Sequence, residues 1–203
     1  MNPLQFRPII YFSFVLLVFW GCARTLEEPF SHDIQTLNMV HNSVKTYGIF
    51  IDNIRVGTNT LTIRTNILKS FHTISYRCVA LIEDIHLMDA TTQTITYLKP
   101  VSNGYIFLSD DYPNLTKTYI PLPITKNSAF FGPFSAITTD PVSLTAVAVH
   151  KTFVTYTGLV FDNVIEARSA TNQIRLFINS DHFIIQREDY RYRPTIQTLL
   201  LPS

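Results

Sequence analysis

Glycine is scarce in this chain, with six residues among 203. Phosphate-binding loops and nucleophile elbows depend on glycine, because it lets the main chain approach a ligand closely or adopt a strained turn. The sequence contains no G-x-S-x-G elbow, no P-loop and no G-x-G-x-x-G motif. Its six histidines are scattered singly. The sequence therefore predicts a protein that is not an enzyme and that carries no metal or other cofactor.

Charge is sparse as well. Charged residues make up 15% of the chain, they nearly cancel to a net charge of +1, and no acidic or basic tail is present. A neutral chain lacks the long-range field that gathers nucleic acid or an anionic membrane. We therefore expect no nucleic-acid partner.

The chain also lacks an apolar run of full transmembrane length. The uncharged stretch from Pro8 to Ala23 has 16 residues and lies between Arg7 and Arg24. At about 1.5 Å per residue a helix of this length spans about 24 Å, less than the roughly 30 Å of a bilayer's hydrocarbon core. A positive start, a short apolar run and small residues after it are typical of a secretory signal peptide. We expect export.

The end of this run resembles the signal of bacterial lipoproteins, in which a small residue precedes a lipid-modified cysteine. Gly21 and Cys22 match that pattern, whereas Phe19 and Trp20 depart from the leucine and the small residue usual there. The resemblance implies a signal peptide over residues 1–21, a lipid on Cys22, and attachment to a membrane of the cell envelope. Because Ala23 and not Asp follows Cys22, it further implies the outer membrane, facing the periplasm.

An ordinary signal peptidase could instead cut after Ala23 and release a secreted protein. The cysteine count bears on this choice, because the chain has only Cys22 and Cys78. Cys22 lies at the signal boundary and is poorly placed for a disulfide within a core. Lipidation gives Cys22 a role and leaves Cys78 as a buried, unpaired thiol.

After the signal, a weak helical pattern precedes Gly48. Ser31 or Asp33 can cap a helix there, and apolar residues and one histidine follow at helical spacing: Ile34, Leu37, His41 and Val44. We expect residues 22–46 to form a lipid-anchored spacer that contains this short helix.

Beyond Gly48 the apolar period changes to two, as in "NTLTIRTNIL", where Leu61, Ile63 and Ile67 alternate with polar residues. The chain is rich in threonine, β-branched and aromatic residues, which favour strands. The candidate strands are separated by turn sequences such as "VGTN" and "SDDYPN". The predicted fold is mainly β: an antiparallel β-sandwich or barrel over residues 47–203, with the one short N-terminal helix.

The stretch from Ile120 to Pro141 interrupts this pattern with four prolines. It contains "FFGPF", which places Phe130, Phe131 and Phe134 around a Gly-Pro pair. If these rings are exposed, they form a contact surface for a protein partner, since exposed apolar patches usually mark interactions. If they are buried, they cap the open end of the core. We take the three phenylalanines as the candidate partner-binding residues.

Two charged segments receive a structural interpretation. The segment "EDIHLMD" holds Glu83, Asp84, His86 and Asp89, but alternation along a strand turns Glu83 away from Asp84 and His86, so no metal site is predicted. The segment from Arg187 to Pro194, "REDYRYRP", is interpreted as an exposed edge strand whose charges discourage pairing.

Taken together, the sequence predicts an exported, lipid-anchored envelope protein with a non-enzymatic binding or assembly role, such as an accessory lipoprotein of a secretion or envelope complex. One alternative is a soluble, secreted, ligand-binding β-barrel. A further alternative is an envelope hydrolase that uses Cys78 with a distant histidine.

Overall fold

The computed structural model describes residues 34–71, 73–88, 90–109, 117–134 and 140–202. The chain divides into two units, Met1–Ser31 and His32–Ser203, and all described residues belong to the second. Within these residues no helix is long and apolar enough to cross a bilayer.

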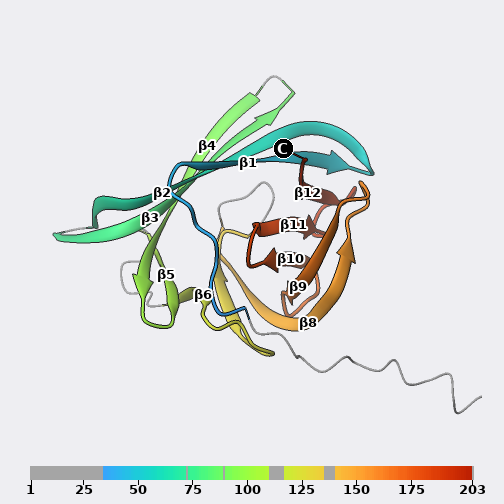
Figure 1. Cartoon of the computed structure of the whole chain (residues 1–203). Coiled ribbons are helices and arrows are strands. Elements are labelled where there is room, and N and C mark those ends of the chain that lie inside the picture. Colours follow the sequence, from blue (N-terminus) through green and yellow to red (C-terminus); the bar gives the residue numbers. More distant parts are fainter. Residues whose placement is uncertain (1–33, 72, 89, 110–116, 135–139, 203) are drawn as a thin grey trace, which may run out of the picture. The chain divides into compact units, whose positions relative to one another are not determined.

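The second unit is built from one antiparallel sheet of 12 strands (Figure 1). The strands are β1 (Ser43–Ile51), β2 (Ile54–Phe71), β3 (Ile74–Leu87), β4 (Ala90–Val101), β5 (Gly104–Leu108), β6 (Thr118–Pro121), β7 (Ala129–Gly132), β8 (Val142–Val154), β9 (Val160–Arg168), β10 (Ile174–Asn179), β11 (Phe183–Asp189) and β12 (Ile196–Leu200). Their order in the sheet is β6-β5-β4-β3-β2-β1-β12-β11-β10-β9-β8-β7. The predicted antiparallel β fold is confirmed.

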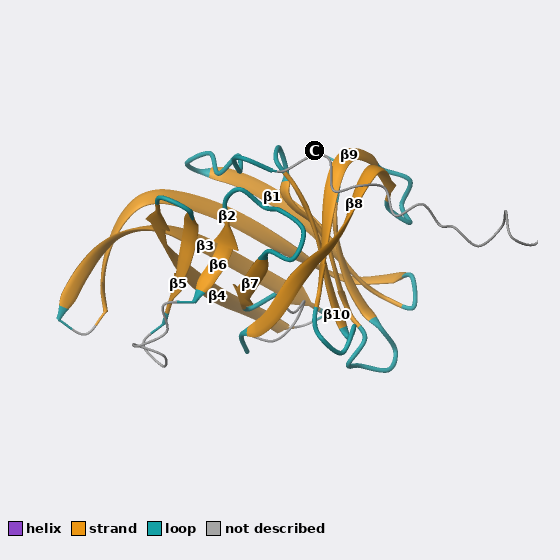
Figure 2. Cartoon of the chain, turned by 90° about the horizontal axis from the view of Figure 1, so that it is seen from below, coloured by secondary structure: helices purple, strands orange, loops and turns teal. Residues whose placement is uncertain are grey.

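The sheet rolls up so that its two end strands approach each other. Figure 2 shows the four-residue strands β6 and β7 side by side, although they are the first and last strands in the sheet order. The result is a nearly closed, barrel-like sheet. In the middle of the order β1 pairs with β12, so that the first and last strands of the chain are neighbours.

The short helix predicted before Gly48 is wrong for the described residues. Ile34 forms an isolated antiparallel bridge with Ile124, the main-chain N–H of Asn38 donates to the carbonyl oxygen of Ser180 at 2.8 Å, and β1 already begins at Ser43. Ile34 and Leu37 of the proposed helical stripe are instead buried along an extended chain, whereas Val44 is exposed on β1. Pairing of β1 with both β2 and β12 outweighs a weak local periodicity.

The faces of β2 and β3 follow the expected alternation up to a β-bulge. Leu61 and Ile63 are fully buried and face the interior. A register shift between Arg64 and Ile67, with Asn66 at a φ of 60°, reverses the alternation. Ile67 therefore lies opposite Cys78 on the outer face, and its predicted place beside Leu61 and Ile63 is wrong. The bulge also places Lys69 and Phe71 on the outer face.

Candidate functional site

The predicted lipid attachment site, Cys22, lies outside the described residues. The three candidate phenylalanines are described, and all three lie at the junction between β6 and β7. Phe130 is 1% exposed and Phe134 is fully buried, whereas Phe131 is half-buried. An exposed aromatic tip is therefore not formed by Phe130 and Phe134. Of the three rings, Phe131 is the one that a partner could reach on the folded domain, and its role as a contact residue stays a prediction.

These rings close the rolled sheet where main-chain pairing ends. The ring of Tyr119 on β6 lies 4.8 Å from that of Phe134, and Phe130 packs edge-on against Phe134 at 6.4 Å between centroids. Phe131 packs in the same manner against Phe107 of β5 at 6.2 Å. We call this set the aromatic seam: Phe107, Tyr119, Phe130, Phe131 and Phe134.

Gly132 makes this closure possible. A Cβ atom at this position would lie 2.5 Å from two carbons of the Tyr119 ring, which is closer than such contacts occur. The "FFGPF" sequence therefore supplies rings on both sides of a residue that must have no side chain. Its aromatic content was visible in the sequence, but the ring that it packs against, Tyr119, lies about ten residues away on β6.

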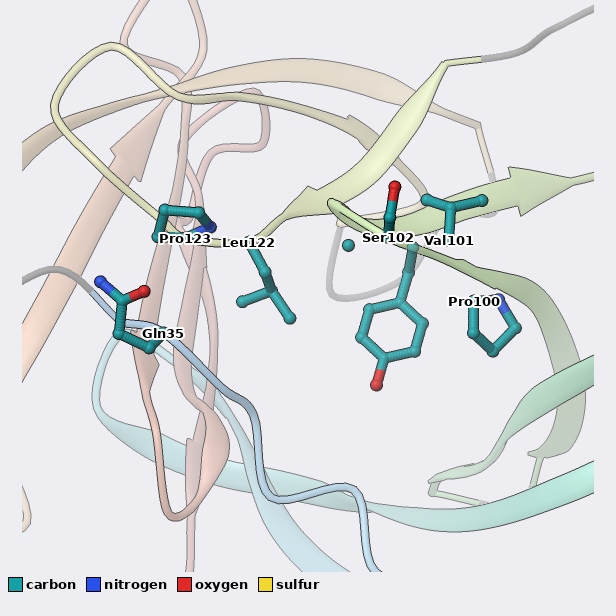
Figure 3. A pocket seen from close by; sticks show the side chains of 8 residues that line it. Gln35, Pro100, Val101, Ser102, Leu122 and Pro123 are labelled. Atoms are coloured by element: carbon teal, nitrogen blue, oxygen red, sulfur yellow. The ribbon is translucent and has the colours of Figure 1, made fainter.

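A surface hollow of about 310 Å³ lies next to the aromatic seam (Figure 3). Its walls come from the turn between β4 and β5, from the residues that follow β6, and from the beginning of the described chain. The lining residues are Gln35, Pro100, Val101, Ser102, Gly104, Tyr105, Leu122 and Pro123. Burial raises the pKa of the Tyr105 phenol, which keeps it a neutral hydrogen-bonding group at the edge of this space. The hollow can hold a small molecule or a partner's side chain.

Gly104 allows the turn between β4 and β5 to form this wall. Its φ is +126°, and a Cβ atom here would lie 2.2 Å from the carbonyl oxygen of Ile120. The main chain of the turn therefore lies directly against β6. Sequence reasoning missed the hollow, because its three walls lie far apart along the chain.

An ion pair crosses the interior of the sheet. The Nη2 atom of Arg187 on β11 lies 2.7 Å from Oε1 of Glu83 on β3, and the side chains are 5% and 10% exposed. Asn59 on β2 donates to the same oxygen at 2.9 Å. In the sheet order β2, β1 and β12 separate β3 from β11. The pair therefore joins opposite walls of the rolled sheet.

Two buried tyrosines complete the surroundings of this ion pair. Tyr47 donates its hydroxyl hydrogen to the carbonyl oxygen of Ile184 at 2.9 Å. Burial raises the pKa of both Tyr47 and Tyr119, so both phenols stay neutral. Burial alone would lower the pKa of the Arg187 guanidinium, but attraction to Glu83 and a hydrogen bond with it raise the pKa overall, and Arg187 stays charged.

The interior group leaves two buried polar atoms without a hydrogen-bond partner: Nε of Arg187 and Oδ1 of Asn59. One is a donor and the other an acceptor, and both side chains contact Glu83. A single water molecule offers both kinds of partner. The arrangement is suited to holding the two walls of the sheet together.

The predicted edge strand "REDYRYRP" is wrong in its placement. β11 contains Arg187–Asp189 and pairs with β10 on one side and β12 on the other. Every residue of β11 is buried. The error has a physical reason: Arg187 is paired with Glu83, a residue distant in sequence that comes near only after folding. Asp189, by contrast, pairs with Arg191 two residues along the chain.

On the outer face of β8 to β11, Glu166 accepts hydrogen bonds from His150 and Arg168. Its carboxylate lies 2.9 Å from Nε2 of His150 and 2.5 Å from Nε of Arg168, with Arg175 at 4.0 Å. Burial by itself raises the pKa of Glu166, but the hydrogen bonds from His150 and Arg168 more than offset this and lower the pKa to about 2. Glu166 is therefore ionised throughout the neutral and mildly acidic range.

This lowered pKa predicts an acid-sensitive contribution to stability. The ionised Glu166 carboxylate stabilises the fold fully at pH values above 4.5, the pKa of a glutamate in the unfolded chain. This stabilisation is lost as the pH falls towards 2, where Glu166 becomes protonated in the folded protein. The stability advantage of the wild type over Glu166→Gln should therefore shrink below about pH 4.5. Urea unfolding at several pH values between 7 and 3 measures it, with the exposed Asp52→Asn as control. If the difference in free energy of unfolding between the wild type and Glu166→Gln stays constant over this pH range, the proposed contribution of ionised Glu166 is contradicted.

Cys78 is buried on the outer face of β3, with 1% of its surface exposed. Burial raises the pKa of its thiol, although nearby Lys99 lowers it in part. A nucleophilic cysteine needs the opposite environment, exposed and with a lowered pKa. The buried thiol predicted from the sequence is confirmed.

In a Cys22→Ser chain, a thiol-reactive probe should therefore label Cys78 far more slowly in the folded state than in denaturant. Following labelling by mass with time measures this difference. Rapid labelling of the folded protein would contradict the burial of Cys78 and would favour the hydrolase alternative.

The segment "EDIHLMD" has the alternation that was predicted. Glu83 faces the interior, whereas Asp84 accepts a hydrogen bond from Gln93 at 2.7 Å and His86 contacts Thr91 at 3.0 Å. Over the part of the chain that the structure describes, no three His, Cys, Asp or Glu side chains are grouped closely enough to hold a metal ion. Asp89 lies outside the described residues.

No protein-family model, curated protein or solved structure matches this chain.

Proposed function

We propose that the chain is an exported, lipid-anchored protein of a bacterial cell envelope with a non-enzymatic binding or assembly role. Cys22 carries the lipid at the outer membrane, facing the periplasm, and the β domain engages a protein partner there.

The observation that carries the binding role is the hollow beside the aromatic seam. It is bordered by Gln35, at the beginning of the described chain, and by the residues after β6. Gln35 lies 13 positions after Cys22. A fully extended chain of this length reaches about 45 Å at most. A lipid on Cys22 would therefore tether Gln35 within about 45 Å of the membrane, within reach of other envelope proteins.

The anchor is tested by membrane fractionation of two matched variants in a bacterial host. Cys22→Ser should move the protein from the membrane fraction to the soluble fraction, because it removes the acyl chains that hold firmly when more than one is attached. Cys78→Ser changes the only other cysteine and should leave the protein in the membrane. Equal distribution of both variants would contradict the anchor.

The binding role is tested by filling the hollow. Ser102→Trp should weaken cross-linking of the anchored protein to its envelope partner, whereas Thr152→Trp, an exposed position on β8, should not. Unchanged cross-linking with Ser102→Trp would show that the partner does not bind at the hollow.

A second candidate function, a secreted ligand-binding protein cleaved after Ala23, is favoured by the volume of the hollow. About 310 Å³ falls at the lower end of the range of small-molecule pockets. Under this alternative the mature protein would be soluble with or without Cys22.

A further inference from the structure

One outer surface of the sheet gathers cations and aromatic rings. It lies on β2, β3 and β4, on the side of the bulge nearer the β2–β3 turn. We call it the basic aromatic face, formed by Arg64, Lys69, Phe71, Tyr76, Tyr97 and Lys99. The strand register places these residues on one side: Lys69 pairs with Tyr76, Arg64 pairs with Ala80, and Ala80 pairs with Tyr97.

The cations and rings of this face contact one another. The Nζ atom of Lys69 lies 5.1 Å from the centre of the Tyr97 ring and 5.9 Å from that of Phe71. Nζ of Lys99 lies 4.9 Å from the Tyr76 ring. Phe71 packs against Tyr97 at 5.7 Å and Tyr76 at 6.3 Å between centroids. The face is therefore one continuous layer in which ammonium groups lie over rings.

The fold separates charges that cancel over the whole chain. The sequence has no acidic residue between Asp52 and Glu83, and Glu83 is turned to the interior. Among the described residues of β3, the nearest carboxylate on the same side is Asp84. It lies four residues beyond Ala80, about 13 Å along the strand, and accepts a hydrogen bond from Gln93. The net charge of +1 thus conceals a locally basic surface.

Exposed aliphatic side chains accompany these cations. Ile74, which pairs with Phe71, is 56% exposed, and Ile95, which pairs with Ile82, is 44% exposed. Both share the side of the sheet that carries the basic aromatic face. The two views show the end of the β2–β3 hairpin projecting away from the rest of the sheet (Figures 1 and 2). The part of the face on this hairpin therefore projects from the sheet.

We propose that the basic aromatic face binds an anionic lipid surface. Its cations complement phosphate headgroups, its tyrosines have the apolar body and polar tip that suit a membrane interface, and Ile74 and Ile95 can enter the boundary of the acyl chains. Single-stranded nucleic acid fits less well, because base stacking needs open ring faces, and lysines lie over Tyr76 and Tyr97. This contact goes beyond the proposed anchor. Only its place in the cell rests on the proposed envelope location.

The test compares the partition of the full chain between vesicles with and without an anionic lipid. Acyl chains on Cys22 enter phosphatidylcholine vesicles and vesicles that also contain phosphatidylglycerol alike. Arg7 and Arg24 are the same in every variant, so the change in the ratio of the two partition coefficients between variants reports the face. The wild type should prefer the anionic vesicles, and the preference should fall with added salt. Lys69→Gln with Lys99→Gln should lower the ratio by about fivefold per cation, about 25-fold in all.

A matched control removes two exposed cations elsewhere. Arg55→Gln with Lys151→Gln should keep the wild-type ratio.

A second experiment uses tryptophan fluorescence. In a Trp20→Phe background, the tryptophan introduced by Ile74→Trp should shift its emission to shorter wavelength when anionic vesicles are added. The proposal is overturned if the wild type shows no anionic preference, if both double variants lose it equally, if the tryptophan emission does not move, or if an oligonucleotide binds more tightly than the vesicles. None of these results depends on lipidation, so the proposed anchor can fail or succeed independently.

Discussion

Replacing Arg187 by methionine should destabilise the β domain by about 3–5 kcal/mol. The substitution keeps much of the side-chain volume but leaves the Glu83 carboxylate buried without its counter-charge. Total stabilities of domains lie at about 5–15 kcal/mol, so this single change should bring the protein close to unfolding. Urea unfolding followed by circular dichroism measures the effect.

The double variant Arg187→Met with Glu83→Gln should be more stable than Arg187→Met alone. Glutamine removes the stranded charge and keeps an oxygen that can accept the hydrogen bond from Asn59. Arg55→Met, at an exposed position, should change stability by less than about 0.5 kcal/mol. Additive effects of the two interior substitutions would contradict a direct interaction between Arg187 and Glu83.

Replacing Phe134 by alanine should cost about 3–5 kcal/mol, because the ring is fully buried between Tyr119 and Phe130 at the aromatic seam. β6 and β7 are the two ends of the sheet order, and their described residues form no ladder of main-chain pairs that could hold the junction once the rings are lost. Thermal and urea unfolding measure the loss.

Phe131→Ala is the matched control for this prediction, because it removes the same ring from a half-buried position two residues from Pro133. It should cost clearly less than Phe134→Ala. If the two variants lose equal stability, the contribution of these rings to stability does not follow their burial, and the prediction is contradicted. If Phe131→Ala folds normally and loses its envelope partner, the predicted contact role of Phe131 is supported.

The antiparallel β fold could be predicted because alternation is a local property of each strand. Leu61 and Ile63 face the interior as their spacing predicts. The bulge after Arg64 could not be predicted, since it depends on how β2 pairs with β3. Simple alternation therefore predicted the wrong face for Ile67. The prediction of a helix before Gly48 was wrong for a related reason. A local periodicity does not show that β1 pairs with a strand on each side.

The candidate sites show the same limit. The "FFGPF" cluster was found from its composition, but its packing against Tyr119 required the sheet to roll up. The ion pair between Glu83 and Arg187 joins residues about a hundred positions apart, and no local pattern in the sequence connects them. The basic aromatic face was hidden by a net charge near zero, because summing over the chain removes all information about where the charges lie.

The measurement that tests the central claim most directly is the intact mass of the mature protein recovered from a bacterial host. The proposed function predicts a chain that begins at Cys22 and carries the added mass of acyl chains. An unmodified chain that begins at Arg24 would contradict it, and the β domain would then be a secreted binding protein.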